Sequence, residues 1–419
     1  MRKLLVILLL LPLGACYQPQ GSDGGPTGRP LLGPVKLHGF GPRVAVGANL
    51  VVVIRADGSL WAWGDNRLGQ VGINKATSEY DYVPQPALVD AGRNWYAVAA
   101  GEDHCLGLRR DGTLWAWGDN HDGMLGTGPD IALLAGAIAP VQVGTATDWV
   151  AVAAGRFHSL ARRADGSLWS WGDNNSAQLG NAPWPGPDTA WYNVPRRVGP
   201  AGTRWAAFAG GGTMTLAVRA DGTLYSWGAN DTDQLGRPGL TRTLIKDSTG
   251  VYPRPQPVPG GLPWRRVAAG WGFGAGIRRD GSLWVWGDKS GNEDGQQHGP
   301  TLISQPRDTT WVKVAAGSDH CLALRRDGSL WAWGENGFGQ LGTGNRADSA
   351  GFRQFVRVGS GQQWRDVAAG RDTSVGLQAD GSCWLWGDNG LARPKPGAEA
   401  PAPLLQPTRV VFPPAPASH

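Results

Sequence analysis

Short runs of alternating apolar and polar residues, separated by turn residues, make up most of the chain. In residues 95–118, "WYAVAAG" is an apolar run that ends in Gly, and "LGLRR" and "TLWAWG" each place apolar residues at every second position. A period of two residues is typical of half-buried strands, and the "DG" between the second and third runs is a turn signal. A fourth strand is expected at "PVQV" (140–143), because Pro is tolerated at a sheet edge. The pattern predicts a four-stranded antiparallel meander, and no convincing helical period occurs elsewhere.

This meander recurs seven times along the chain. The pattern DG[ST]xxxWG returns at spacings of 54, 54, 56, 59, 47 and 53 residues, starting from Asp57. A period of about 50 residues indicates an array of small units, and seven such units can close a ring. We therefore predict an all-β fold, a seven-bladed β-propeller of four-stranded antiparallel blades over residues 34–412, followed by a Pro-rich tail at 413–419. The last tryptophan of each copy is expected to fill a joint between blades; these residues are Trp63, Trp117, Trp171, Trp227, Trp286, Trp333 and Trp386.

The repeat also carries a family resemblance. "VAAGEDHCLGLRRDGTLWAWGDNHDGMLG" resembles the repeat of the regulator of chromosome condensation (RCC1) family, whose marks are AGxxH, then DG, then WGxNxxGQLG. The resemblance implies an RCC1-like propeller that binds proteins through its faces. We do not carry over the family founder's nucleotide-exchange activity or its chromatin binding. His104, His158 and His320 occupy the AGxxH position and are expected to make structural hydrogen bonds; a catalytic or metal role is the alternative.

The first residues predict export and a lipid anchor. "MRKLLVILLLLPLGAC" has a basic start and an apolar stretch too short to span a bilayer, which suits a signal peptide over residues 1–15. Its end resembles the bacterial lipobox, which implies that Cys16 becomes the lipidated N-terminus; an ordinary signal peptide is the alternative. Residues 16–33 are rich in Gly, Pro and Ser and are expected to be a flexible tether. We expect a lipid-anchored protein of the bacterial cell envelope, at the outer membrane.

Charge and cysteines exclude some classes of function. The formal net charge is +5, or +3 once Arg2 and Lys3 are removed with the signal peptide, and no Lys/Arg cluster stands out, so no nucleic-acid partner is expected. Adjacent arginines before the turns, such as Arg109 and Arg110, are interpreted as solvated turn flanks; a phosphate-binding stripe is the alternative. Cys105, Cys321 and Cys383 fall in separate units and are expected to be buried thiols.

The order of strands predicts where a partner binds. If the strands of each unit are A to D, the A–B and C–D loops emerge on one face, and these loops hold the variable residues and the long insertions. Variable loops on a rigid scaffold are where function tends to lie, and aromatic and Arg residues anchor partners well. Trp184, Trp191 and Trp271 lie outside the framework positions; packing of their own loops is the alternative. The candidate partner-binding residues are Glu102, Asp103, Arg156, Phe157, Trp184, Trp191, Trp271, Phe273, Asp319 and Arg371.

These observations favour a membrane-tethered, non-catalytic interaction scaffold, expected to be monomeric, whose partner is an unknown protein or envelope polymer. We expect no catalytic residue, no metal site and no cofactor, because no nucleophile motif or set of converging ligands is evident. Two alternatives stay open. One is an enzyme inhibitor similar to the secreted β-lactamase inhibitor that has an RCC1-like propeller. The other is a glycan-active or other enzyme that uses the axial cleft.

Overall fold

The computed structural model describes residues 41–414, apart from 76–81, 93, 130–134, 182–190, 238–239, 241–250, 262, 288–300, 303–307, 348–354, 362 and 393–400. The expected signal peptide, Cys16 and the tether lie outside the described residues, as does Trp184. The signal peptide, the lipidation of Cys16, the flexible tether and partner binding by Trp184 therefore stay predictions.

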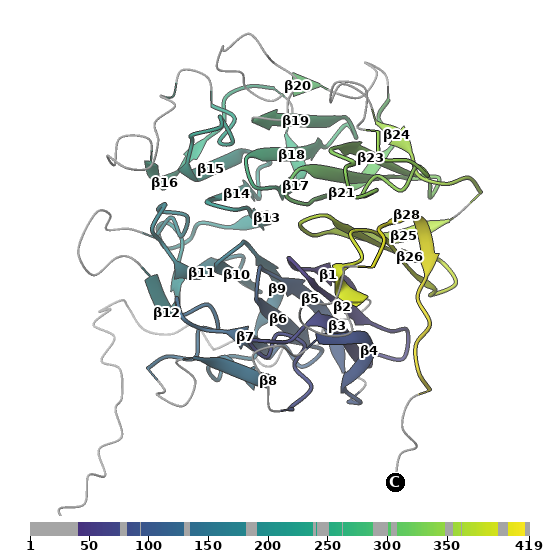
Figure 1. The fold of residues 1–419 in the computed structure, drawn as a ribbon. Helices are drawn as coiled ribbons and strands as arrows, with labels where there is room; N and C mark the ends of the chain where they lie inside the picture. The colour runs from purple at the N-terminus through teal and green to yellow at the C-terminus, as the bar shows by residue number, and fades with distance from the viewer. Residues whose placement is uncertain are drawn as a thin grey trace, which may run out of the picture. The chain divides into compact units, whose positions relative to one another are not determined.

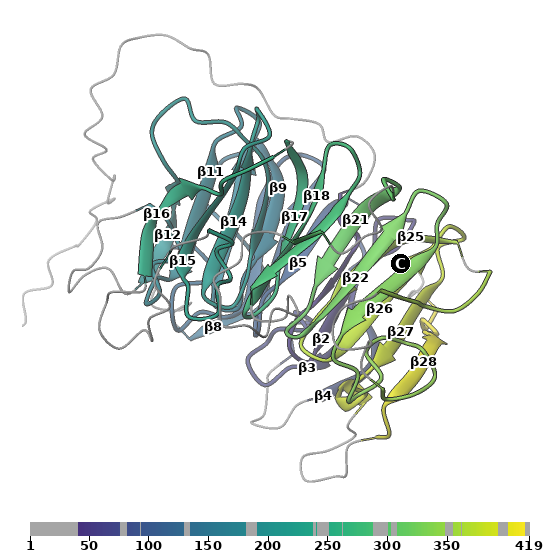
Figure 2. The same cartoon turned by 90° about the horizontal axis from the view of Figure 1, so that it is seen from above.

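Seven four-stranded antiparallel sheets, each built from one continuous stretch of chain, form the fold. The first three blades contain β1 (Val44–Val46), β2 (Leu50–Ile54), β3 (Leu60–Asp65) and β4 (Tyr82–Asp90); β5 (Trp95–Ala100), β6 (His104–Arg109), β7 (Leu114–Asp119) and β8 (Gly136–Gln142); and β9 (Trp149–Ala154), β10 (His158–Arg163), β11 (Leu168–Asp173) and β12 (Trp191–Arg197). Figure 1 shows the chain passing from blade to blade around a ring, and Figure 2 shows strands of successive blades side by side.

The remaining four blades repeat this arrangement, and the outer strands of the fifth and sixth blades are only two residues long. They contain β13 (Trp205–Gly210), β14 (Met214–Arg219), β15 (Leu224–Ala229) and β16 (Val251–Pro257); β17 (Trp264–Ala269), β18 (Phe273–Arg278), β19 (Leu283–Gly287) and β20 (Thr301–Leu302); β21 (Trp311–Ala316), β22 (His320–Arg325), β23 (Leu330–Gly334) and β24 (Val356–Arg357); and β25 (Trp364–Ala369), β26 (Thr373–Gln378), β27 (Cys383–Gly387) and β28 (Leu404–Arg409), with the short 3-10 helix η4 (Gly390–Ala392) after β27. The predicted seven-bladed propeller of four-stranded antiparallel blades is confirmed.

Each DG[ST] turn is held by a short chain of hydrogen bonds. In the first blade, Asp57 Oδ1 accepts hydrogen bonds from the backbone N and the hydroxyl of Ser59, at 3.0 and 2.6 Å. The Ser59 hydroxyl in turn accepts from Trp61 Nε1 at 2.9 Å. Gly58 has a φ of 84°, a conformation that glycine adopts without strain. The turn motif therefore fixes the first tryptophan of each pair as well as the reversal of the chain.

The second tryptophan of each pair joins neighbouring blades. Trp117 is fully buried, and its Nε1 donates to the backbone oxygen of Gln70 in the preceding blade, at 3.0 Å. Trp171 does the same to the Met124 oxygen at 2.8 Å, and Trp227, Trp286 and Trp386 repeat the contact. Trp63 and Trp333 are buried at the same repeat position. The repeated tryptophan thus both fills the joint and satisfies a buried carbonyl.

The paired arginines before the turns are not all solvated, so that interpretation is wrong for one member of each pair. The Arg109 guanidinium lies 4.9 Å from the centre of the Trp95 ring and 3.8 Å from that of Trp115. Equivalent stacks place Arg163, Arg278 and Arg325 over the framework tryptophans of their own blades. A guanidinium over an aromatic face is attracted by the ring quadrupole, so these arginines belong to the framework.

The ring closes between the last and the first blade. Strand β1 packs against β25 and β26, and the end of the chain crosses to the first blade, where the Phe412 ring meets Trp61 and Trp63 edge-on, at 5.6 and 6.0 Å. Arg55 covers the same ring at 5.1 Å. The segment after β28 therefore fastens the closing joint.

Phe412→Ala is expected to lower the free energy of unfolding by roughly 2 kcal/mol, because it removes a half-buried ring from this joint. Urea denaturation followed by tryptophan fluorescence measures the change. The neighbouring Val411 is 81% exposed, so Val411→Ala serves as the control and should change stability little. Equal effects of the two substitutions would show that the tail does not fasten the ring.

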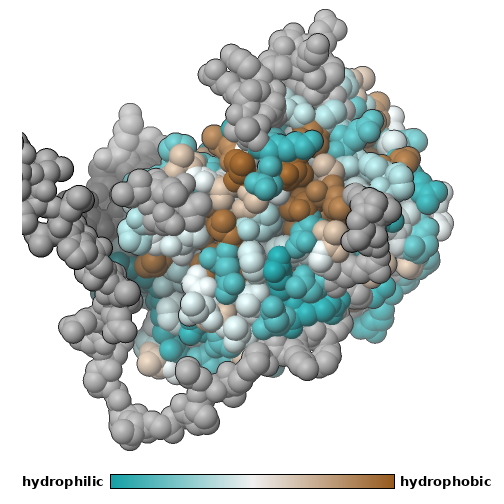
Figure 3. Space-filling view, turned by 90° about the horizontal axis from the view of Figure 1, so that it is seen from below, coloured by the Kyte–Doolittle hydropathy of each residue, from teal (hydrophilic) through white to brown (hydrophobic). Residues whose placement is uncertain are grey.

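The remaining surface and cysteine features are simple. Cys105, Cys321 and Cys383 are free and buried, as expected. Apolar residues form separate patches between hydrophilic ones on the face seen in Figure 3. No helix within the described ranges is both long enough and apolar enough to cross a membrane.

Candidate functional site

The A–B and C–D loops share one face of the ring, as the strand order predicts. Gln70, in the C–D loop of the first blade, donates from Nε2 to Oδ1 of Asp103 in the A–B loop of the second, at 3.2 Å. Thr232 and the Gly272 oxygen repeat this contact between the fourth and fifth blades, at 3.0 Å. We call this face the loop face, and the opposite one, which carries the DG[ST] turns, the turn face.

Four predicted partner-binding residues meet around the axis on the loop face. Glu102 accepts a hydrogen bond from Arg156 Nε at 2.6 Å and another from Arg371 Nη2 at 3.1 Å. The two guanidinium groups lie 4.6 and 5.4 Å from the centre of the Trp271 ring. We call Glu102, Arg156, Trp271 and Arg371 the axial cluster. Since its members come from blades 2, 3, 5 and 7, only closure of the ring brings them together.

Trp271 is the exposed centre of this axial cluster. Trp271 is 38% exposed. Beside it, Glu102 forms ion pairs with both Arg156 and Arg371, which fixes the three side chains. The cavity beneath is only about 90 Å³, because glycines such as Gly155 and Gly317 bring the innermost strands together. A cavity of that size excludes all but very small ligands, so a partner would bind on top of the axial cluster rather than inside it.

The other predicted loop-face residues differ in their environment. Phe157 lies under Arg156, with the guanidinium 4.7 Å from its ring centre. Asp103 is largely buried, and burial together with the neighbouring charge of Glu102 raises its pKa to about 6. Trp191, at the start of β12, is 42% exposed and lies away from the axis at the outer edge of its blade. Asp319, in the A–B loop of the sixth blade, is half-buried.

Phe273 is not available to a partner, which corrects one predicted position. The residue is fully buried, and its ring lies 5.6 Å from that of Trp333 in the next blade, at 62°. It occupies the repeat position at which other blades have His. In the fifth blade the aromatic ring fills the joint by packing, whereas in blades with His the joint is linked by a hydrogen bond.

The three repeat histidines link blades through a relay of hydrogen bonds. His104 Nε2 lies 2.9 Å from Ser159 Oγ in the next blade, and that hydroxyl donates its only proton to the Met124 oxygen at 2.7 Å. His104 must therefore be the donor, so its neutral ring carries the proton on Nε2. His158 with Thr215, and His320 with Ser374, repeat this arrangement.

Burial keeps these histidines neutral. It lowers the pKa of His104 to about 4 and those of His158 and His320 to about 3. Each Nδ1 lies close to the glycine that follows the preceding strand, where a Cβ would collide with the ring. Within the described part of the chain, no three His, Cys, Asp or Glu side chains converge as metal ligands.

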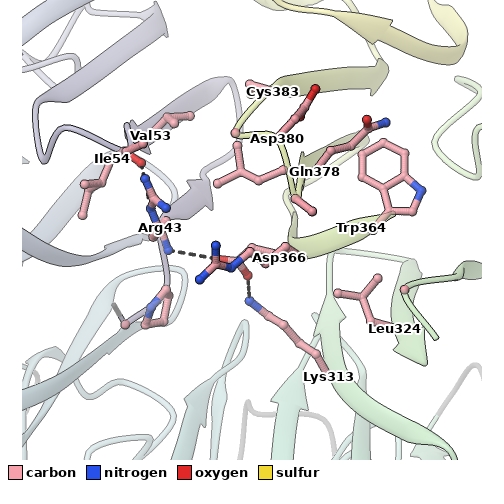
Figure 4. Close-up of a pocket in the computed structure, with 18 of the residues that line it drawn as sticks. Arg43, Val53, Ile54, Lys313, Leu324, Trp364, Asp366, Gln378, Asp380 and Cys383 are labelled. Atoms are coloured by element: carbon pink, nitrogen blue, oxygen red, sulfur yellow. Dashed lines mark hydrogen bonds and ion pairs between the residues drawn. The ribbon is translucent and has the colours of Figure 1, made fainter. Parts of the chain in front are cut away.

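A further cavity lies on the turn face, where the sequence did not predict a site. It has a volume of about 740 Å³ and is lined by blades 1, 5, 6 and 7 (Figure 4). Arg43, Arg266, Lys313 and Asp366 reach it from the innermost strands or the residue just before β1. Asp366 accepts hydrogen bonds from Lys313 Nζ and from the backbone N of Arg43, the latter at 2.9 Å.

A positional signal for these residues exists in the sequence. The innermost strand of each blade from the second to the seventh begins with a tryptophan. The residue two places after that tryptophan, together with its equivalent in the first blade, forms a ring around the axis. We call this set the axial ring; it consists of Arg43, Ala97, Ala151, Ala207, Arg266, Lys313 and Asp366. Alignment of the repeats on their Gly residues would have shown that this position is small in three blades and charged in four.

Sequence comparison identifies the family to which this chain belongs. A model described as the RCC1-like domain matches residues 33–297, and two models of the regulator of chromosome condensation (RCC1) repeat match residues 311–340 and 327–377. The chain is 30% identical over 267 residues to the E3 ubiquitin-protein ligase HERC2 of Homo sapiens, covering 61% of this chain and 5% of the ligase. It is 28% identical over 259 residues to the ultraviolet-B receptor UVR8 of Arabidopsis thaliana, covering 61% of this chain and 55% of the receptor.

Solved structures agree with the sequence comparison. Human WBSCR16 superposes with a TM-score of 0.68 at 25% identity, covering 82% of this chain and 88% of that one. Prp20p of Saccharomyces cerevisiae superposes with a TM-score of 0.67 at 20% identity, covering 88% of each chain. Because the match spans so little of HERC2 and about half of UVR8, the activities of those whole proteins do not transfer with it. The repeats, the seven blades and the matching domain model together show that this chain belongs to the RCC1 family.

Proposed function

We propose that this protein is a membrane-tethered, non-catalytic scaffold that binds a protein partner through the axial cluster on its loop face. The observation that carries the proposal is the exposed Trp271 ring, flanked by two arginines that a single carboxylate orients. Tryptophan and arginine are the residues that contribute most often to binding energy in protein interfaces. Because Glu102 already fixes both arginines, a partner would lose little side-chain entropy in binding them.

The fold and the expected anchor support the same proposal. Prp20p, which shares the propeller, binds Gsp1p and histones. The lipobox resemblance at Cys16 would hold such a propeller at a membrane surface through the tether of residues 16–33. Among the residues that the structure describes, the cavity at the axis of the loop face measures only about 90 Å³, which favours a flat protein contact over catalysis there.

The test compares baits of the full chain with detergent-solubilised cell envelopes. We expect the wild-type protein to retain one stoichiometric partner, and Trp271→Ala to retain at least about tenfold less, since a central aromatic anchor is worth roughly 2 kcal/mol or more. Quantitative mass spectrometry of the retained proteins measures the ratio.

Two control baits locate the contact. Trp191→Ala removes a tryptophan of similar exposure from the outer edge of a blade, and Arg326→Ala removes a charge from the turn face. Full retention by both, with loss by Trp271→Ala, would place the partner on the axial cluster. Retention by Trp271→Ala equal to the wild type would contradict the proposal, and loss with Trp191→Ala alone would move the interface to the rim.

A further inference from the structure

The axial ring divides into an alanine half and a charged half. Blades 2, 3 and 4 place Ala97, Ala151 and Ala207 at this position, whereas the next four blades around the ring place charged residues there. The charged residues are contiguous in space, because the seventh blade packs against the first. Three of them are cations and one is a carboxylate, so the charged half of the axial ring carries a net charge of +2 (Arg43, Arg266, Lys313 and Asp366).

The single carboxylate is already fully engaged. Asp366 accepts from Lys313 Nζ, from the backbone N of Arg43 at 2.9 Å and from the backbone N of Val367 at 3.0 Å. Figure 4 shows Lys313 and the Arg43 backbone directed at Asp366 from opposite sides. Arg266 has no ion-pair partner among the described side chains. Asp366 therefore serves several donors. The lining of the cavity also includes Asp380, but its arginines and Lys313 outnumber the two carboxylates and leave an excess of positive charge.

Neighbouring cations repel the three cations of the axial ring. Burial lowers the pKa values of Arg43, Arg266 and Lys313, and repulsion adds to the effect: Arg365 acts on Arg43, Arg265 on Arg266, and Arg266 on Lys313, while Asp57 opposes it at Arg43. The Asp366 carboxylate accepts from Lys313 Nζ and from the backbone N of Arg43. A bound anion would relieve the remaining repulsion, so the empty cavity is electrostatically complementary to negative charge.

The walls of the cavity suit an organic ligand. Val312, Leu324 and Leu377 supply apolar surface beside the charged residues, and Arg326 and Arg365 add further positive charge towards the mouth. A volume of about 740 Å³ falls in the range of pockets that hold small organic molecules, about 300–1,000 Å³. A single inorganic ion would leave most of this space empty.

We propose that the turn-face cavity binds a small organic anion carrying two or more phosphate or carboxylate groups, held by Arg43, Arg266 and Lys313. Arginine offers such groups two parallel hydrogen bonds, and lysine adds a point charge. The site is separate from the axial cluster, which lies at the other end of the axis, and the proposal does not depend on the protein-binding function.

Isothermal titration calorimetry of the full chain in detergent tests the site, with pyrophosphate and citrate as probes at matched ionic strength. We expect binding of at least one probe, and the tighter of the two identifies whether phosphate or carboxylate is the preferred group. Arg266→Ala should weaken it about tenfold, because it removes one charge-assisted contact. The variant should fold normally, because three other blades carry Ala at this position of the axial ring.

Two further variants distinguish a specific anion-binding site from non-specific attraction of anions to positive surface charge. Arg357→Ala removes the same charge from the exposed outer strand β24 and should leave affinity unchanged. Asp366→Asn raises the net charge of the axial ring from +2 to +3 and should tighten binding about tenfold, although it removes a structural ion pair. A purely structural role for these residues predicts no such gain.

The outcomes are decisive in both directions. Weaker binding by Arg266→Ala together with unchanged binding by Arg357→Ala supports the site, and tighter binding by Asp366→Asn supports it independently. Failure of the wild-type protein to bind either probe with a dissociation constant below about 1 mM would overturn the proposal. Equal affinity of Arg266→Ala and Arg357→Ala would overturn it too, since the anion would then be bound by surface charge alone.

Discussion

Trp171→Ala is expected to lower the free energy of unfolding by about 3–5 kcal/mol, the range for removing a fully buried aromatic side chain. Trp171 has no exposed surface, and its Nε1 donates to the Met124 oxygen of the preceding blade at 2.8 Å. The substitution opens a cavity in a joint of the ring and removes one of the two donors to that buried carbonyl. Since folded domains are stable by only about 5–15 kcal/mol, one such joint is a large part of the total.

The same strand supplies a matched control. Trp169 lies two residues earlier on the same face, but it is half-buried and its Nε1 bonds to Ser167 of its own turn. Trp169→Ala should cost less, about 1–2 kcal/mol, and Trp171→Phe should fall between the two because it keeps most of the ring volume. Urea denaturation of the three variants gives the order. Equal losses for Trp169→Ala and Trp171→Ala would show that the joints between blades contribute no more than the turns.

Periodic features of this fold could be predicted from the sequence because they repeat. The turn at Asp57, the joint at Trp117 and the shared face of the A–B and C–D loops each follow from strand alternation and chain direction, and the structure places them as expected. The repeat also indicated which loop residues could face a partner, and Glu102 and Arg371 do meet across the axis.

Features that depend on closure of the ring could not be predicted in this way. Arg43 and Asp366 are 323 residues apart, and their contact exists only because the seventh blade meets the first. Phe273 is a different case: it stands at the repeat position of the relay histidines, so its burial in the joint with Trp333 could have been predicted from the repeat. The stacking of Arg109 could also have been predicted from the repeat, because the residue two places before the Asp of the DG turn is Arg in six of the seven blades, whereas the position of Arg110 is Arg in only three.

The relay histidines should make the protein sensitive to mild acid. His104, His158 and His320 have pKa values of about 4, 3 and 3 in the folded protein, against an ordinary value of 6.5. Below pH 6.5 the unfolded chain therefore binds protons at these residues that the folded chain does not. Their stabilising contribution is complete above pH 6.5 and is lost as the pH falls towards the folded values. At pH 5, 1.5 pH units below 6.5, each histidine accounts for about 2 kcal/mol of lost stability.

Two buried carboxylates act in the opposite direction. Burial and neighbouring acids raise the pKa values of Asp103 and Asp372 to about 6, so between pH 3.8 and 6 the folded protein holds protons that the unfolded chain releases. Their contribution is greatest in acid and disappears as the pH rises through 6. Around pH 6 both sets of groups titrate differently in the two states, and below pH 6 the three histidines oppose these two carboxylates.

The net expectation is a fall of about 3 kcal/mol or more in the free energy of unfolding between pH 7 and pH 5, measured by urea denaturation at each pH. Replacing all three histidines with Gln keeps an N–H donor for Ser159, Thr215 and Ser374 but removes the titrating groups. Because Asp103 and Asp372 would still titrate and the histidines would not, the triple variant should become more stable by about 1–2 kcal/mol as the pH falls from 6 to 5, the reverse of the wild type. If the triple variant lost as much stability in acid as the wild type, the acid sensitivity would come from other groups. The relay histidines would then only link the blades.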